Sequence, residues 1–187
     1  NVTGIGIINA TYGLASVCLN INHPNVSDLE IYLRAPNGTM IPLSVQNGGT
    51  GSNYTNTCFT ATSTTPIAAG IAPFTGDFRP HGNLGIVNNG QNANTVWSLC
   101  IRDLFTPNAG SLVSWSLLFN NTPALPNAIP INDDPCNAIP LAVGATCNYV
   151  TYTNENATGS INVPAPGCGN YSGADVWFSV TVPAGGG

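Results

Sequence analysis

Short stretches in which apolar and polar residues alternate recur along the first two thirds of the chain. In residues 15–21, for example, Val17, Leu19 and Ile21 are separated by small or polar residues. Successive side chains of a β-strand point to opposite faces, so this alternation predicts a strand with one buried face. The same pattern predicts strands at residues 29–34, 40–44, 55–60, 95–102 and 111–119. Turn residues separate these stretches, and uninterrupted helical spacing is absent, which predicts an all-β, jelly-roll β-sandwich over residues 1–119.

The apolar positions of these strands define a predicted core. Within each strand they share one parity, except for Leu112 beside Trp115 and Leu117, so those of one parity should face the same side of a sheet. The predicted core residues are Val17, Leu19, Leu29, Ile31, Leu33, Phe59, Trp97, Leu99, Ile101, Leu112, Trp115 and Leu117.

The composition changes at residues 120–131, where prolines and asparagines predict an extended linker. A second unit is expected over residues 132–187, with strands near 138–143, 146–151 and 175–182. So few strands cannot close a sandwich, which makes this unit a partial β-sandwich. Either the unit is cut short or a partner completes it.

Charged side chains are scarce. They make up 6% of the chain, against about 25% in an average soluble domain. The only cations are Arg34, Arg79 and Arg102, and the formal net charge is -5. Binding to nucleic acid or to an anionic membrane surface needs clustered Lys and Arg, so neither partner is expected. No apolar run approaches the roughly 18 residues needed for membrane insertion as a helix.

The six cysteines predict disulfides, because no two of them form a CxxC pair of the kind that binds zinc. Disulfides persist in oxidising compartments, so we expect a secreted, extracellular or cell-surface protein with at least two of them. Cys18 and Cys100 share outward parity and form one plausible pair, with Cys58 as the rival partner of either. In the second unit, which also holds Cys147, the expected pair is Cys136 with Cys168.

Five ordered motifs carry a family resemblance. They are His-Pro-Asn-Val-Ser-Asp-Leu at 23–29, Ala-Pro-Asn-Gly-Thr at 35–39, Pro-Phe-Thr-Gly at 73–76, the Trp97-containing stretch 94–103, and the Trp115-containing stretch 110–117. With them, residues 1–119 resemble the P domain (P/Homo B domain) found beside subtilisin-like proprotein convertases. Pro24 and Ser27 depart from the family pattern, which has Thr and Gly there. Residues 132–187 resemble the opening of a β-sandwich module of large secreted bacterial modular proteins.

The P-domain resemblance implies a module without a catalytic site, because convertases carry their triad in a separate domain. The residues agree: no Gly-x-Ser-x-Gly elbow is present. His23 fits a hydrogen-bonded residue at a strand end. Asp28 and Glu30 share the polar face of a strand, which is normally solvent-exposed. We therefore expect no enzymatic activity.

Calcium is the one cofactor that the residues suggest. Asp28 and Asp103 lie at loop–strand junctions, and the loop at 49–53 ends in Asn53. Carboxylate, amide and main-chain oxygens of such loops are the ligands that calcium prefers. The alternative is that both aspartates only satisfy turn amides.

Three functions remain open from the sequence. The first is a structural or assembly module, which self-associates as a filament subunit or joins neighbouring modules of a larger surface protein. The second is an accessory P domain of a secreted protease, and the third is a carbohydrate-binding or adhesive module. The apolar N-terminal residues 2–10 suggest a strand that adds to another subunit's sheet. Alternatively, they form the first strand of their own sandwich.

Overall fold

The structure, a computed structural model, describes residues 1–126, 128–143, 149–154, 156–157 and 175–181. The chain divides into two compact units, Asn1–Pro126 and Asn127–Gly187. The boundary falls inside the segment 120–131 that the sequence predicts as a linker.

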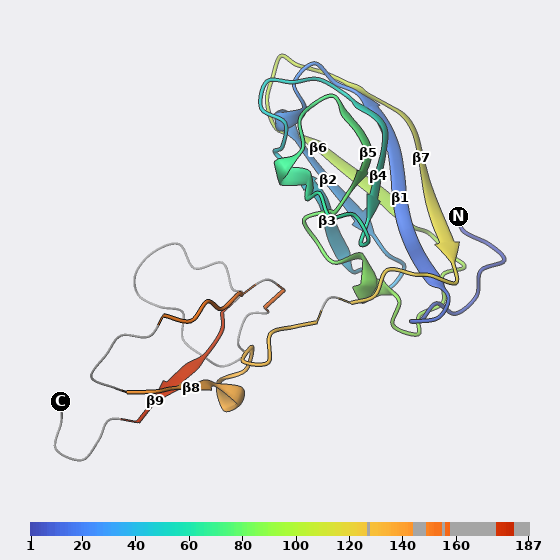
Figure 1. Cartoon of the computed structure of the whole chain (residues 1–187). Coiled ribbons are helices and arrows are strands. Elements are labelled where there is room, and N and C mark those ends of the chain that lie inside the picture. Colours follow the sequence, from blue (N-terminus) through green and yellow to red (C-terminus); the bar gives the residue numbers. More distant parts are fainter. Residues whose placement is uncertain (127, 144–148, 155, 158–174, 182–187) are drawn as a thin grey trace. The chain divides into compact units, whose positions relative to one another are not determined.

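The first unit is a β-sandwich, which confirms the predicted all-β class (Figure 1). One sheet has the order β5-β4-β1-β7 and the other the order β3-β2-β6. Short 3-10 helices join some of the strands: η1 (Val26–Asp28), η2 (Ile67–Ala69) and η3 (Leu84–Val87). The strands are β1 (Gly13–Asn22), β2 (Leu29–Arg34), β3 (Met40–Val45), β4 (Tyr54–Thr60), β5 (Phe74–Phe78), β6 (Ser98–Asp103) and β7 (Ser111–Asn120). The jelly-roll connectivity stays a prediction.

Alternation located most of these strands because each central strand buries one face. In β1, Val17 lies opposite Phe59 of β4 and Leu117 of β7. Strand β5 was not predicted. Gly76 interrupts its alternation, and it pairs with β4 in parallel, a register set by distant residues.

Most of the predicted core is confirmed. Val17, Leu19, Leu29, Ile31, Leu33, Phe59 and Trp97 are buried, while Leu99, Trp115 and Leu117 are partly buried against them. The prediction is wrong for Ile101 and Leu112, which are 36% and 42% exposed. Both lie on strands β6 and β7, where no further segment of the first unit covers the inward-facing side chains.

The N-terminal residues 2–10 follow the surface of their own unit as an irregular segment. The Val2 amide donates to the Thr95 carbonyl at 2.9 Å, and the Ile8 amide donates to the Gln91 carbonyl at 3.0 Å. Gly4 and Gly6 have φ of 78° and 81°. This left-handed conformation interrupts an extended strand. The segment is therefore docked on its own unit, and the strand expected there does not form.

The described residues of the second unit include two short strands, β8 (Ile139–Leu141) and β9 (Phe178–Val180), which pair in parallel. They lie within the predicted strands 138–143 and 175–182. Of the third predicted strand, residues 146–148 lie outside the described residues, and residues 149–151 form no strand. Within the described part of the chain, no helix is long and apolar enough to cross a membrane.

Candidate docking site on the open side of the sandwich

Two of the three predicted calcium residues contact His23 at the end of β1. Asn53 Oδ1 accepts a hydrogen bond from the His23 amide at 2.9 Å, and the Asn53 amide donates to the His23 carbonyl at 3.0 Å. Asp103 Oδ2 lies 3.1 Å from His23 Nε2. These oxygens therefore already have protein partners.

Asp28, the third predicted calcium residue, is 4% exposed and also fully engaged. Its Oδ1 accepts from Asn25 Nδ2 at 2.8 Å and its Oδ2 accepts from Asn108 Nδ2 at 2.9 Å. Among the described residues, no group of three or more His, Cys, Asp or Glu side chains could hold a metal ion. The calcium prediction thus rests on the sequence alone.

His23 is buried, and both of its ring nitrogens are occupied. Nε2 faces Asp103, and Nδ1 lies 2.8 Å from the Asn25 carbonyl oxygen. A general base needs a free nitrogen within reach of the proton that it removes. The geometry instead gives His23 a structural role, in which it ties the end of β1 to the end of β6.

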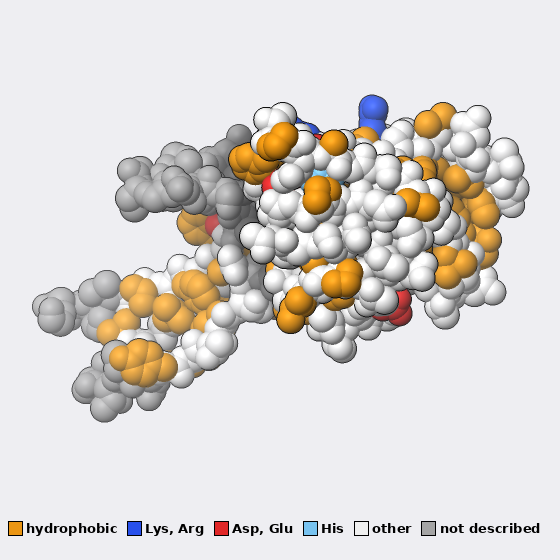
Figure 2. All heavy atoms as spheres, turned by 90° about the horizontal axis from the view of Figure 1, so that it is seen from above, with side chains coloured by type: hydrophobic (Ala, Val, Ile, Leu, Met, Phe, Trp, Pro, Cys, Tyr) orange, Lys and Arg blue, Asp and Glu red, His pale blue; other side chains and the backbone are white. Residues whose placement is uncertain are grey.

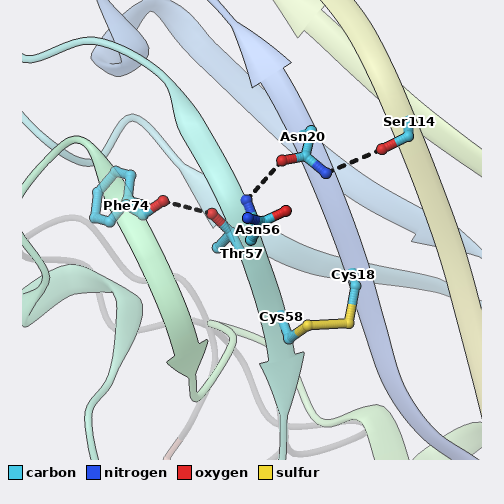
Figure 3. The surroundings of a disulfide bond; sticks show 7 residues. All are labelled: Cys18, Asn20, Asn56, Thr57, Cys58, Phe74 and Ser114. Carbon is cyan, nitrogen blue, oxygen red and sulfur yellow. Dashed lines mark hydrogen bonds between the residues drawn. A yellow bond between two sulfur atoms is a disulfide. The ribbon is translucent and has the colours of Figure 1, made fainter.

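The outer face of the four-stranded sheet carries a disulfide between Cys18 of β1 and Cys58 of β4, with the two Cα atoms 4.0 Å apart (Figure 3). Beside it, Asn20 Nδ2 donates to Ser114 Oγ at 2.9 Å and Asn20 Oδ1 accepts from the Asn56 amide at 2.6 Å. This small polar network connects β4, β1 and β7.

The expected Cys18–Cys100 pair is wrong, and the rival Cys18–Cys58 pair forms. Strand β6, which carries Cys100, belongs to the other sheet, so outward-facing cysteines of β1 and β6 lie on opposite surfaces. Cys100 and Cys136 carry free thiols, so the expected pair of Cys136 with Cys168 does not form. Cys147 and Cys168 lie outside the described residues, so the prediction of a second disulfide stays a prediction.

The most unusual feature of the sandwich is the side where β6 and β7 form the two sheet edges. Within the described chain, each of these strands pairs with a single neighbour. Ile101 lies opposite Ile31, yet Ile101 is 36% exposed while Ile31 is fully buried. Likewise Leu112, opposite the 3% exposed Ile21, is 42% exposed. The interior of the sandwich therefore reaches solvent here.

We call this surface the open side and define it by six inward-facing residues of β6 and β7: Leu99, Ile101, Leu112, Trp115, Leu117 and Phe119. Two hollows lie along it. A hollow of about 420 Å³ is lined by Trp97, Trp115, Leu117, Phe119 and residues of the N-terminal segment. A second of about 250 Å³ is lined by Ile101 and Leu112 together with Ile21 and Leu29.

The open side is nearly free of charge. His23 and Asp103 line one end of the second hollow, where they contact each other. Charged side chains are sparse over the visible face of the molecule as well (Figure 2). Unpaired strand edges beside exposed apolar side chains fit an extended, uncharged polypeptide, which can add main-chain hydrogen bonds and bury its side chains.

Sequence reasoning assigned these residues to the core and missed the open side. Alternation shows that Ile101 faces inward, and the register shift that turns Leu112 inward is visible only in the structure. Neither signal shows whether a further strand covers these residues. The absence of Lys was the available signal, because edge strands are commonly protected by charged side chains, and those of Lys above all.

The comparison with known families decides the relationship. The family model described as the proprotein convertase P-domain matches residues 14–119. The chain belongs to the proprotein convertase P-domain family. The match spans β1 to β7, so the whole sandwich is the P domain. No significant match was found among curated proteins or among solved structures. Family membership and the Cys18–Cys58 disulfide both fit an extracellular protein.

Proposed function

We propose that this P domain is a non-catalytic, extracellular assembly module that receives an extended, uncharged segment of a neighbouring polypeptide along its open side. The supporting observation is the exposure of inward-facing residues on two adjacent strand edges, β6 and β7. Burying apolar surface away from water stabilises a complex by about 25 cal/mol per Å². A segment covering the open side would therefore stabilise an assembly without any charged contact.

The low charge of the chain supports the same function. Free monomers commonly carry charges that keep sheet edges apart. Here Arg102, on β6, forms an ion pair with Glu30 at 3.4 Å. In β6 both Cys100 and Arg102 have the parity opposite to the inward-facing Leu99 and Ile101. Arg102 therefore leaves the apolar face unprotected, and the inward-facing charge of this strand is Asp103 at its end, beside His23.

The test compares the full-length wild-type chain with its Leu112→Glu variant. Both proteins are secreted, collected in oxidised form from the medium around the producing cells, and studied by sedimentation velocity. Ile71→Glu is the matched control, because Ile71 is 85% exposed and lies outside the open side. We expect wild type and Ile71→Glu to sediment as complexes and Leu112→Glu as single chains. If Leu112→Glu sediments like wild type, the open side is not the docking surface.

The absence of catalysis is tested on the same preparations. We expect no turnover of peptide or glycan substrates beyond that of a buffer blank. Turnover that disappears with His23→Ala, in a variant that stays folded, would overturn the non-catalytic part of the proposal.

Family membership favours a second candidate, the accessory domain of a secreted subtilisin-like protease. In that case the open side would receive a surface of the catalytic domain. If a protease domain is encoded in the same precursor, its melting temperature should rise when the P domain is attached, and the rise should be lost with Leu112→Glu. The third function open from the sequence, carbohydrate binding, has less support because Trp97 is buried and Trp115 faces inward.

A further inference from the structure

The two sheets of the P domain differ by one strand, and the missing position lies at the open side. The sheet with β1 has four strands and the sheet with β2 has three, ending at β6. A strand added beside β6 would give four strands facing four. It would also lie over the inward-facing Trp115 and Leu117 of β7, which the present three-stranded sheet leaves half-exposed.

The docked N-terminal segment does not fill this position. Asn1, Val2, Thr3 and Ile5 line the hollow at Trp97 and Trp115. The Val2 and Ile5 amides donate to the loop at Asn94 and Thr95. The end of the open side at Ile101 and Leu112 is lined by β1, β2, β6 and β7 residues and the turn before β7. The occupant must therefore come from another part of the protein or from another molecule.

The linker offers a segment of matching chemistry. Ile129 and Ile131 are 57% and 79% exposed, and no charged residue lies between Asn120 and Asn132. In an extended chain, residues two apart point to the same face. Once residues 128–131 are extended, both isoleucines would thus enter the open side together, in the spacing that Leu99 and Ile101 of β6 also have.

Pro130 makes this segment suited to an edge and to nothing else. Proline has no amide hydrogen, so a strand that contains it can pair fully along one edge only. Neighbouring residues of a strand direct their main-chain groups to opposite edges. Ile129 and Ile131 could therefore pair with β6, while Pro130 faces away from it. The Pro130 carbonyl accepts from the Asp133 amide at 3.1 Å, which closes a turn through Ile131 and Asn132, so this turn has to open for the segment to extend along β6.

We propose that residues 128–131 of one copy of this chain dock beside β6 in the open side of a second copy. This inference rests on the proposed function and names the partner as the chain itself. Donor and acceptor are different surfaces, so each copy can give and receive once, and the contact propagates head to tail.

The experiment uses three versions of the full oxidised chain in sedimentation velocity over a wide range of concentration. The donor variant is Ile129→Glu with Ile131→Glu, the acceptor variant is Leu112→Glu, and the control is Val143→Glu. Val143 has the same 57% exposure as Ile129 and lies in the second unit outside the linker. We expect wild type and the control to grow into long assemblies with concentration, and both other variants to remain single chains.

Mixing the two inactive variants gives the decisive result. The acceptor variant keeps its linker and the donor variant keeps its open side, so together they should form a one-to-one pair that grows no further. Failure to pair, with both variants folded by circular dichroism, overturns the inference. So does a wild-type chain that stays monomeric at every concentration.

A donor variant that assembles like wild type, while Leu112→Glu does not, also overturns the inference. It would mean that a different segment fills the open side, and the proposed function would stand. Assembly that survives in both variants overturns the inference and the proposed function together.

Discussion

The two sides of the sandwich carry the same kind of strand edge and differ completely in how they are covered. On one side the edges are β3 and β5, where Ile41, Leu43 and Phe74 are fully buried. On the other side the edges are β6 and β7, where Ile101 and Leu112 are 36% and 42% exposed. Position at an edge therefore does not explain the exposure of the open side.

The closed side, defined by Ile41, Leu43, Phe74 and Phe78, is sealed by the chain that surrounds it. The Phe74 ring stacks on Tyr54 with 4.8 Å between centroids and meets Phe78 edge-on at 5.5 Å. The fully buried Ile67 of η2 is part of the same core. The comparison teaches that this unit buries a strand edge where local segments are available, and that at β6 and β7 such a segment is missing.

The largest expected effect is on the closed side. Phe74→Ala should lower the free energy of unfolding by about 3–5 kcal/mol, because it removes a fully buried ring and leaves a cavity. Urea denaturation followed by tryptophan fluorescence measures the change. A loss below about 1 kcal/mol would show that the closed side is not sealed as described.

The second effect concerns the disulfide that joins β1 to β4, the two central strands of the four-stranded sheet. The double variant Cys18→Ala with Cys58→Ala should lower the free energy of unfolding by about 2–4 kcal/mol. The reason is that the unfolded chain is no longer restrained by a cross-link between residues with a sequence separation of 40. Cys100→Ala is the control and should leave the stability within about 1 kcal/mol of wild type, since Cys100 carries a free thiol. Equal stability of the double variant and the control would contradict the stabilising role of the Cys18–Cys58 disulfide.

Much of this fold could be predicted from residues because the signals were local. Strand β2 begins and ends where alternation places it, at Leu29 and Arg34. The outward parity of Cys18 and Cys58 was also readable. The partner of Cys18 was not, because pairing depends on which strands are neighbours in a sheet, a property of distant contacts.

The candidate site was predictable only in part for the same reason. Alternation identified Ile101 as inward-facing, and Leu112 was predicted as a core residue, yet their exposure depends on a strand that is absent beside β6. The approach of Asn53 and Asp103 to His23 followed from loops whose path no short pattern encodes. The sequence showed which side chains face inward along a strand, but it did not show which of them other segments of the chain cover.

The third effect is a pH dependence of the closed side. Burial raises the pKa of Tyr54 from 10.0 to about 12, although its hydrogen bond to Ser44 acts in the opposite direction. The neutral phenol is therefore favoured in the folded state. Its contribution is complete below pH 10 and is lost as the pH rises toward 12, by about 3 kcal/mol in all. Denaturation curves across this window measure the loss.

Tyr54→Phe is the matched control for this titration, because it keeps the ring and removes the ionisable group. All other residues are the same in both proteins, so the difference between wild type and Tyr54→Phe isolates Tyr54. If wild type and Tyr54→Phe lose the same stability above pH 10, the burial of the Tyr54 hydroxyl is contradicted.

The smallest stability effect is expected on the open side, where it sharpens the comparison with Phe74. Leu112→Ser should change the free energy of unfolding of the dissociated chain by about 1 kcal/mol or less, because the leucine is already 42% exposed. The same variant should bind less of an apolar fluorescent dye, since it removes part of the lining of the second hollow. Leu43→Ser, from the fully buried closed side, is the contrast and should unfold far more easily. Equal losses for the two variants would mean that Leu112 is as well covered as Leu43, and the distinction between the sides would fail.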